Sequence, residues 1–150
     1  MKTNIKSRFT PALSEKVRGF TILELLVVIA IIVMATILVL ALLNGARERS
    51  RDSRRLEDMR SIETALNLYA ANNAGVYPVA TPVETINGTT DTMSLALLGA
   101  DVIPTIPVDP QHPNSVYTYL SDGNTYTLSF CLETDTIQSY TQGCGNTITQ

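Results

Sequence analysis

The chain has 150 residues, about one domain, and a formal net charge of −3. Residues 1–60 hold all 11 basic residues and six of the 14 acids (+5), whereas residues 61–150 hold the other eight acids and no basic residue (−8). One histidine, two cysteines and no tryptophan offer little material for histidine-based catalysis or a zinc site. The composition therefore disfavours an ordinary cytosolic domain and a redox or zinc enzyme.

The first predicted element is a membrane span. Leu25 to Leu43 is nineteen residues without a charge, close to the ~20 needed to cross a bilayer core. Its fourteen Leu, Ile and Val residues favour insertion by about 4 to 8 kcal/mol. A cleavable signal peptide is the alternative, but its apolar region is usually only about 7–15 residues long and ends in small residues. The length of the run and the charged Arg47-Glu48-Arg49 after it favour a retained anchor.

The basic residues that flank the span do not decide its orientation, because five precede it and six follow it. The C-terminal part carries no basic residue after Arg60 and contains both cysteines, Cys131 and Cys144. Their spacing suits a disulfide in an oxidising compartment. We therefore expect the C-terminal part to lie outside the cytoplasm.

The junction before the span places a carboxylate, Glu24, at the edge of a segment otherwise suited to lipid. Glu24 could simply lie at the level of the lipid headgroups, although charges in spans are usually functional. The stretch RGFTILELLVVIAI resembles the N-terminal signature of type IV pilins and of the pseudopilins of type II secretion. The resemblance implies cleavage between Gly19 and Phe20 by a prepilin peptidase, N-methylation of the Phe20 amine and an assembly role for Glu24. The chain would then be a substrate and not an enzyme.

A physical reason for this arrangement follows from the charges. Cleavage removes a leader, residues 1–19, with five basic residues and one acid (+4), and creates a cationic amine at the end of an apolar helix. An unpaired ion in a water-poor helix bundle is penalised by several kcal/mol. Pairing of the Phe20 amine with Glu24 would therefore fix the axial register of neighbouring helices. The two groups are also four residues apart, so pairing within one subunit stays open.

A single helix is predicted from about Thr21 to Ala71, with a transmembrane half at residues 20–43 and an amphipathic half at residues 44–73. The amphipathic half has an apolar stripe at spacings of three or four: Leu56, Met59, Ile62, Leu66 and Tyr69. No proline occurs between Phe20 and Tyr77, so Gly45 is the expected point of local unwinding. The charged residues from Arg47 to Arg60 predict a solvated helical face with i,i+4 pairs and not a nucleic-acid surface.

Residues 74–150 predict a small globular head. We expect a short helix at 92–98 ending at Gly99, a hairpin of strands 116–120 and 125–131, and a third strand at 136–141. Such a sheet needs a surface to pack on, which the helix stripe supplies. The order of elements resembles an α+β pilin-like fold, one long N-terminal helix packed on a small antiparallel sheet.

The remaining polar residues of the head predict little chemistry. A Cys131–Cys144 disulfide would close a loop of about 14 residues and contribute roughly 3 kcal/mol, the alternative being two free thiols. Glu133 and Asp135 inside that loop are too few for a calcium site, so we expect no metal and no cofactor. His112 is expected in a surface loop, and Asn87-Gly88-Thr89 as a turn and not a glycosylation site.

The predicted function is a structural one: a prepilin that polymerises into a type IV pilus-like helical filament. The C-terminal disulfide loop, commoner in pilins than in major pseudopilins, puts the pilin first. The alternatives are a pseudopilin of type II secretion or DNA uptake, and an uncleaved signal-anchored extracytoplasmic binding domain. The resemblance implies four partners: the prepilin peptidase, other pilin subunits, an inner-membrane assembly platform and, before assembly, the lipid bilayer.

Overall fold

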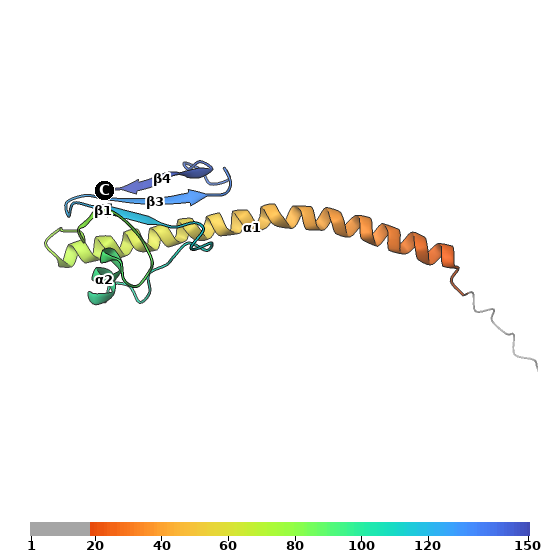
Figure 1. Ribbon diagram of the computed structural model, residues 1–150, viewed down its shortest axis with the longest axis horizontal. Helices are drawn as coiled ribbons and strands as arrows, with labels where there is room; N and C mark the ends of the chain where they lie inside the picture. The colour runs from red at the N-terminus through yellow and green to blue at the C-terminus, as the bar shows by residue number, and fades with distance from the viewer. Residues whose placement is uncertain (1–18) are drawn as a thin grey trace, which may run out of the picture. The chain divides into compact units, whose positions relative to one another are not determined.

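The computed structural model describes residues 19–150, apart from the side chains of residues 41 and 42. The leader expected at residues 1–19 therefore lies, except for Gly19, outside the described residues. The chain divides into two units between Leu40 and Ala41. One helix, α1 (Ile22–Asn72), contributes to both, and the other elements belong to the second unit (Figure 1).

The helix α1 has 51 residues, close to the predicted span of residues 21–71. The helix passes through Gly45 without interruption, so the expected unwinding there is wrong. A glycine costs about 1 kcal/mol in a helix interior, which is too little to break a helix that continues for many residues on both sides of it. Downstream of Asn72, Ala74 has a left-handed φ of 57° and the Gly75 N–H donates to the carbonyl of Ala70 at 2.8 Å. This arrangement is typical of a helix C-terminus.

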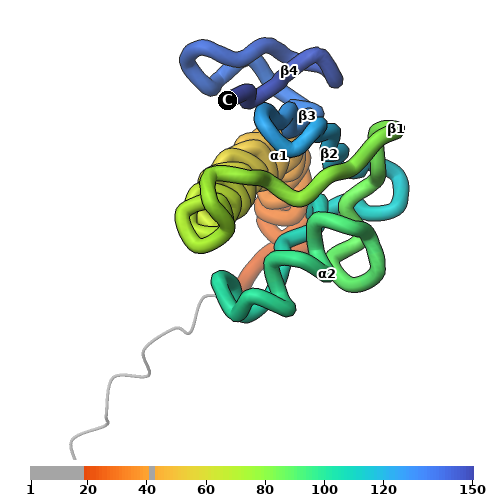
Figure 2. Tube along the Cα trace, turned by 90° about the vertical axis from the view of Figure 1, so that its left-hand side faces the viewer, coloured from red at the N-terminus to blue at the C-terminus, as the bar shows by residue number. Residues whose placement is uncertain are grey.

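The second unit contains a four-stranded antiparallel sheet in the order β1-β2-β3-β4. Its strands are β1 (Ala80–Thr85), β2 (Thr118–Ser121), β3 (Tyr126–Leu132) and β4 (Gly143–Thr149). The short helix α2 (Thr92–Gly99) is capped at its N-terminus by Asp91, whose carboxylate accepts from the Ser94 N–H. Within this unit, α2 and β4 lie on opposite sides of α1 (Figures 1 and 2).

The core of the second unit lies between α1 and one face of the sheet. Met59, Ile62 and Leu66 of the predicted stripe are fully buried, while Leu56 and Tyr69 are half-buried. Strand β3 alternates buried and half-buried residues along its whole length, as expected for a strand with one face on a core. The stripe therefore packs in the core with residues of the sheet, as the sequence predicts; Figure 1 shows the sheet lying along this half of α1.

Two strands differ from the expectation. Strand β1 was not predicted. It has Pro82 in its middle, and a proline is tolerated there because β1 is at the edge of the sheet. The third strand predicted at residues 136–141 is wrong, since the last strand is β4. The apolar residues Ile137 and Tyr140 of that segment pack against the core from a loop and not from a strand.

Candidate functional site

The N-terminal junction lies at the start of α1. Gly19 and Phe20 are exposed and precede the helix, and 84% of the Phe20 surface is accessible. The Thr21 hydroxyl accepts from the Glu24 N–H at 3.2 Å, and the Thr21 carbonyl accepts from the Leu25 N–H at 3.1 Å. Thr21 thus caps the helix, and Glu24 lies in its first turn, where a carboxylate is favoured by the helix dipole. The prediction missed this cap, although Thr-x-x-Glu before an apolar run is the sequence signature of a capping box.

The apolar segment that follows is exposed around its whole circumference. Every side chain from Ile22 to Leu40 is exposed, and α1 is long and apolar enough to cross a membrane. Large contiguous apolar surfaces of this kind mark interaction sites. Within residues 22–43 the one charged side chain is that of Glu24, and its carboxylate accepts no hydrogen bond and forms no ion pair in the part of the chain that the structure describes. This surface needs lipid or other helices to cover it.

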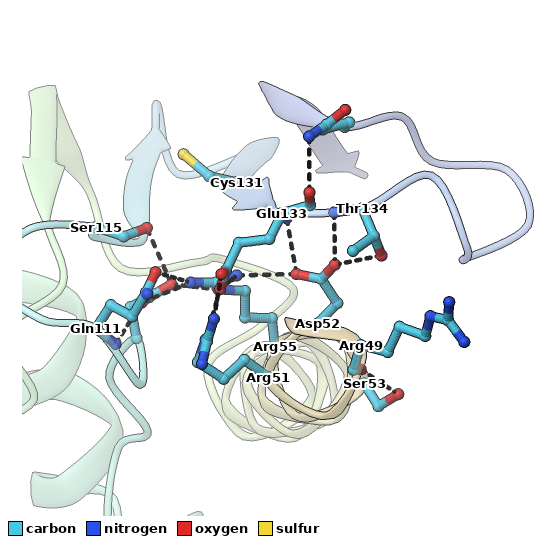
Figure 3. Close-up of polar contacts among 12 residues, drawn as sticks. Arg49, Arg51, Asp52, Ser53, Arg55, Gln111, Ser115, Cys131, Glu133 and Thr134 are labelled. Carbon is cyan, nitrogen blue, oxygen red and sulfur yellow. Dashed lines mark hydrogen bonds and ion pairs between the residues drawn. The ribbon is translucent and has the colours of Figure 1, made fainter. Parts of the chain in front are cut away.

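A second polar site lies in the other unit, around the guanidinium of Arg55 (Figure 3). The side chain is 1% exposed, and each of its five N–H groups has an acceptor. Asp109 binds it bidentately at 2.8 and 3.2 Å, and Asp52 and Glu133 accept from Nη1 at 2.9 and 2.7 Å. Gln111 accepts the fifth bond at 2.9 Å. Burial lowers the pKa of Arg55, but the bonds to Asp109 and Glu133 outweigh burial and raise it, so the cation is retained.

The carboxylates of this cluster are themselves tied to the backbone of the head. Asp52, also fully buried, accepts from the backbone N–H groups of Glu133 and Thr134 at 2.9 and 2.8 Å. Asp109 accepts from the Gln111 N–H at 2.8 Å. Glu133 also binds Arg51, and this hydrogen bond is the main reason that its pKa is lowered. The cluster therefore joins α1 to two loops, one of them inside the disulfide.

This geometry corrects the expectation for the basic residues of α1. Arg55 and Asp52 are buried and bind residues up to 82 positions away, so they are not part of a solvated face. These pairs could not be predicted from the sequence, because the identity of a charged residue does not indicate whether its partner lies on the next turn of the helix or in a distant loop. Four other arginines of the segment are exposed: Arg47, Arg49, Arg54 and Arg60.

The remaining predicted residues lie as follows. Cys131 and Cys144 form a disulfide that links β3 to β4, and the loop between them contains Glu133 and Asp135. In residues 19–150 no group of three or more potential metal ligands comes together. His112 is exposed in a turn, and the Asn87 carboxamide accepts from the Thr90 N–H at 2.8 Å, which closes a turn.

Comparisons with known proteins give one informative match. The chain is 38% identical over 60 residues to the type II secretion system core protein G of Escherichia coli strain K12. This similarity supports the type IV pilin and pseudopilin family. The match spans 40% of this chain and 41% of the relative, so it covers less than half of either protein. No family model matches the chain, and no solved structure matches it significantly.

The fold agrees with that similarity. One long N-terminal helix packed on an antiparallel sheet is the α+β pilin-like architecture that the sequence predicts. Together, the exposed apolar helix and the similarity fit a membrane-anchored structural subunit of the pilin or pseudopilin type.

Proposed function

We propose that the chain is a prepilin that is cleaved after Gly19, methylated on the Phe20 amine and polymerised through its apolar helices into a pilus-like filament. Residues 20–43 would form the polymerising half of the helix, residues 44–73 its amphipathic half and residues 74–150 the head. The observation that carries the proposal is the uncovered apolar surface of residues 22–40, interrupted by one carboxylate at its start. In a bundle of such helices, Glu24 would lack water and would need a cation.

The Phe20 amine is the cation that cleavage would provide. An amine and a carboxylate about 4 Å apart attract each other by roughly 4 kcal/mol at an effective dielectric constant near 20. Because no other charge lies between Phe20 and Leu43, this pair would select one axial register. The uncleaved chain has no amine at this position, so the leader would keep the precursor from assembling.

The second candidate is a pseudopilin, a shorter filament in type II secretion or DNA uptake. The similarity to a type II secretion core protein favours it, whereas the Cys131–Cys144 loop favours a pilin. Both versions need the same partners: a prepilin peptidase, further subunits and an inner-membrane assembly platform. In both, the head lies outside the cytoplasm, where its disulfide is stable.

Processing is tested by the intact mass of the protein from native membranes. We expect the loss of residues 1–19 and the gain of one methyl group. Gly19→Leu should block the cleavage, while Gly45→Leu should not; an added Cβ meets no atom within 4 Å at either glycine, so neither change is expected to disturb folding. A wild-type protein that keeps Met1 would refute the processing step.

Assembly is tested by Glu24→Leu. We expect normal processing and at least an about tenfold loss of filaments, because the amine would be left unpaired. Glu48→Leu is the matched control, since it removes an acid from the same helix beyond the apolar segment, and it should assemble normally. Filaments of wild-type yield from the Glu24 variant would exclude the pairing.

A further inference from the structure

Two turns of α1 separate the apolar segment from the part of the helix that binds the head. We call residues 44–50 the collar; they follow Leu43 directly, and within the described chain Arg51 is the first α1 residue whose side chain bonds to the head. No collar residue is buried, since five are exposed and Gly45 and Glu48 are half-buried. At 1.5 Å per residue the collar is about 10 Å long. It is therefore a short piece of helix that the head leaves uncovered.

The cations of the collar are Arg47 and Arg49. Both are exposed, and neither guanidinium forms a hydrogen bond or an ion pair in the part of the chain that the structure describes. Figure 3 shows the Arg49 side chain directed away from the Arg55 cluster. At 100° per residue the two arginines lie 200° apart, on opposite flanks of the helix. A flat partner meets only one of them, whereas a medium that surrounds the helix meets both.

Glu48 is the one acid of the collar and leaves both arginines unpaired. It adjoins Arg47 and Arg49 in sequence, and i,i+1 neighbours do not face each other on a helix. Its neighbour one turn further on is Arg51, whose pKa is raised chiefly by the bond to Glu133, with a smaller contribution from Glu48. The two arginines are thus available to an anion from outside the chain.

The distance of the collar from the apolar segment selects that anion. Arg47 and Arg49 lie four and six residues after Leu43, about 6 and 9 Å along the helix. The headgroup layer of a bilayer is about 5–8 Å thick on each side of the hydrocarbon core, and an arginine side chain can bend back toward it. Lipid phosphates surround a membrane helix at this level, and guanidinium groups bind phosphate bidentately.

We propose that the collar binds anionic phospholipid headgroups, with Arg47 and Arg49 each taking the phosphate of a different lipid. This contact fixes the depth of the helix in the bilayer at the end nearer the head. It rests on the membrane span and not on cleavage or polymerisation. Arg54 and Arg60 follow Leu43 by about 17 and 26 Å along the helix, so they lie beyond the headgroup layer and take no part.

The test measures lipid selectivity around the full chain in vesicles. The chain has no tryptophan, so Leu43→Trp places a single emission probe at the collar end of the span. Bromine on lipid acyl chains quenches tryptophan at short range, which allows brominated phosphatidylglycerol, an anionic lipid, to be compared with brominated phosphatidylcholine, which has no net charge. We expect the anionic lipid to be enriched about fivefold at the probe, the effect of one arginine near a membrane surface. The enrichment should weaken as salt rises.

Two variants with equal loss of charge locate the contact. Arg47→Gln with Arg49→Gln should remove the enrichment, whereas Arg54→Gln with Arg60→Gln should leave it unchanged. All four arginines are exposed and lie outside the Arg55 cluster, so both variants should fold as wild type does, which near-UV circular dichroism checks. Enrichment that survives in the collar variant, or that is lost equally in both, would overturn the proposal.

A free anion is distinguished from a lipid by adding inorganic phosphate at constant ionic strength. Free phosphate meets only one guanidinium, because the two arginines do not converge, and we expect it to leave the enrichment unchanged. Loss of the enrichment would assign the arginines to the soluble anion and refute the lipid contact.

This proposal and that of the filament fail in different ways, because the vesicles contain no assembly machinery. Equal quenching by the two lipids would overturn the headgroup contact and leave the filament proposal intact. Enrichment at the probe, in a protein that forms no filament in cells, would support the headgroup contact and contradict polymerisation. Absence of quenching by either lipid would contradict the span and with it the headgroup contact.

Discussion

Each unit has a charged side chain of interest, Arg55 in one and Glu24 in the other, and the two differ in whether their own chain supplies a partner. In the second unit, Arg55 of α1 is 1% exposed and all five of its N–H groups bind acceptors from its own chain. At the start of α1, Glu24 borders a long apolar surface and has no partner among residues 19–150. A charge whose partners are internal stabilises one fold, whereas a charge left without a partner beside a large apolar surface is suited to contact with another molecule.

The largest loss of stability is expected when the buried cation is removed. Arg55→Met would leave Asp52 and Asp109 buried without their cation, and should destabilise the head by about 3–5 kcal/mol. The exposed neighbour Arg54→Met is the matched control and should change stability by less than about 0.5 kcal/mol. Near-UV circular dichroism of the full chain in detergent measures both; equal effects of the two variants would contradict an internal role for Arg55.

The disulfide holds the loop that supplies Glu133 to the cluster. Cys131→Ser with Cys144→Ser should lower the stability of the head by roughly 3 kcal/mol, since the closed loop spans about 14 residues. The midpoint of its thermal unfolding, followed by near-UV circular dichroism, should also lie below that of the Arg54→Met variant. A reduced chain as stable as the oxidised one would show that the loop is held by its polar contacts alone.

Acid should weaken the cluster through Glu133. Its pKa is lowered from the ordinary 4.5 chiefly by Arg51, so its contribution is present above about pH 4.5 and is lost as the pH falls toward the folded-state pKa. Glu133→Gln should therefore be less stable than wild type at pH 7, and the difference should shrink below pH 4.5. A difference that is constant from pH 7 to pH 3 would exclude the ion pair as its source.

The smallest expected effect is at the end of α1 and raises stability. Ala74 has a φ of 57°, a left-handed conformation in which glycine is free of the Cβ penalty. Ala74→Gly should stabilise the head by up to about 1 kcal/mol, whereas Ala71→Gly, inside the helix, should destabilise it by a similar amount. Chemical denaturation of the two variants side by side checks the opposite signs.

The sequence predicted those parts of the fold whose signals are local. The bounds of α1, the helix α2 and the β2–β3 hairpin follow from periodicity and turn residues. Strand β4 was missed because Gly143, Gly145 and Asn146 give no alternation of apolar residues. A Gly-rich edge strand is defined by the neighbour that it pairs with, and the sequence does not show that neighbour.

The candidate sites divide in the same way. The motif from Gly19 to Glu24 lies within six residues and could be recognised directly, together with the apolar run behind it. The Arg55 cluster could not, because its partners Asp109 and Glu133 lie 54 and 78 residues downstream. Proximity across such separations is created by packing of the head on α1, which periodicity predicts only in outline.

The separation of Arg55 from Glu133 also orders events during synthesis. The chain emerges from its N-terminus, so α1 is complete about 60 residues before the loop at Glu133 exists. Until then Arg51 and Arg55 lack the carboxylate that they share. A chain truncated before residue 133 would therefore lack the ion pair of Arg51 with Glu133, whereas Arg55 would keep its carboxylate partners Asp52 and Asp109.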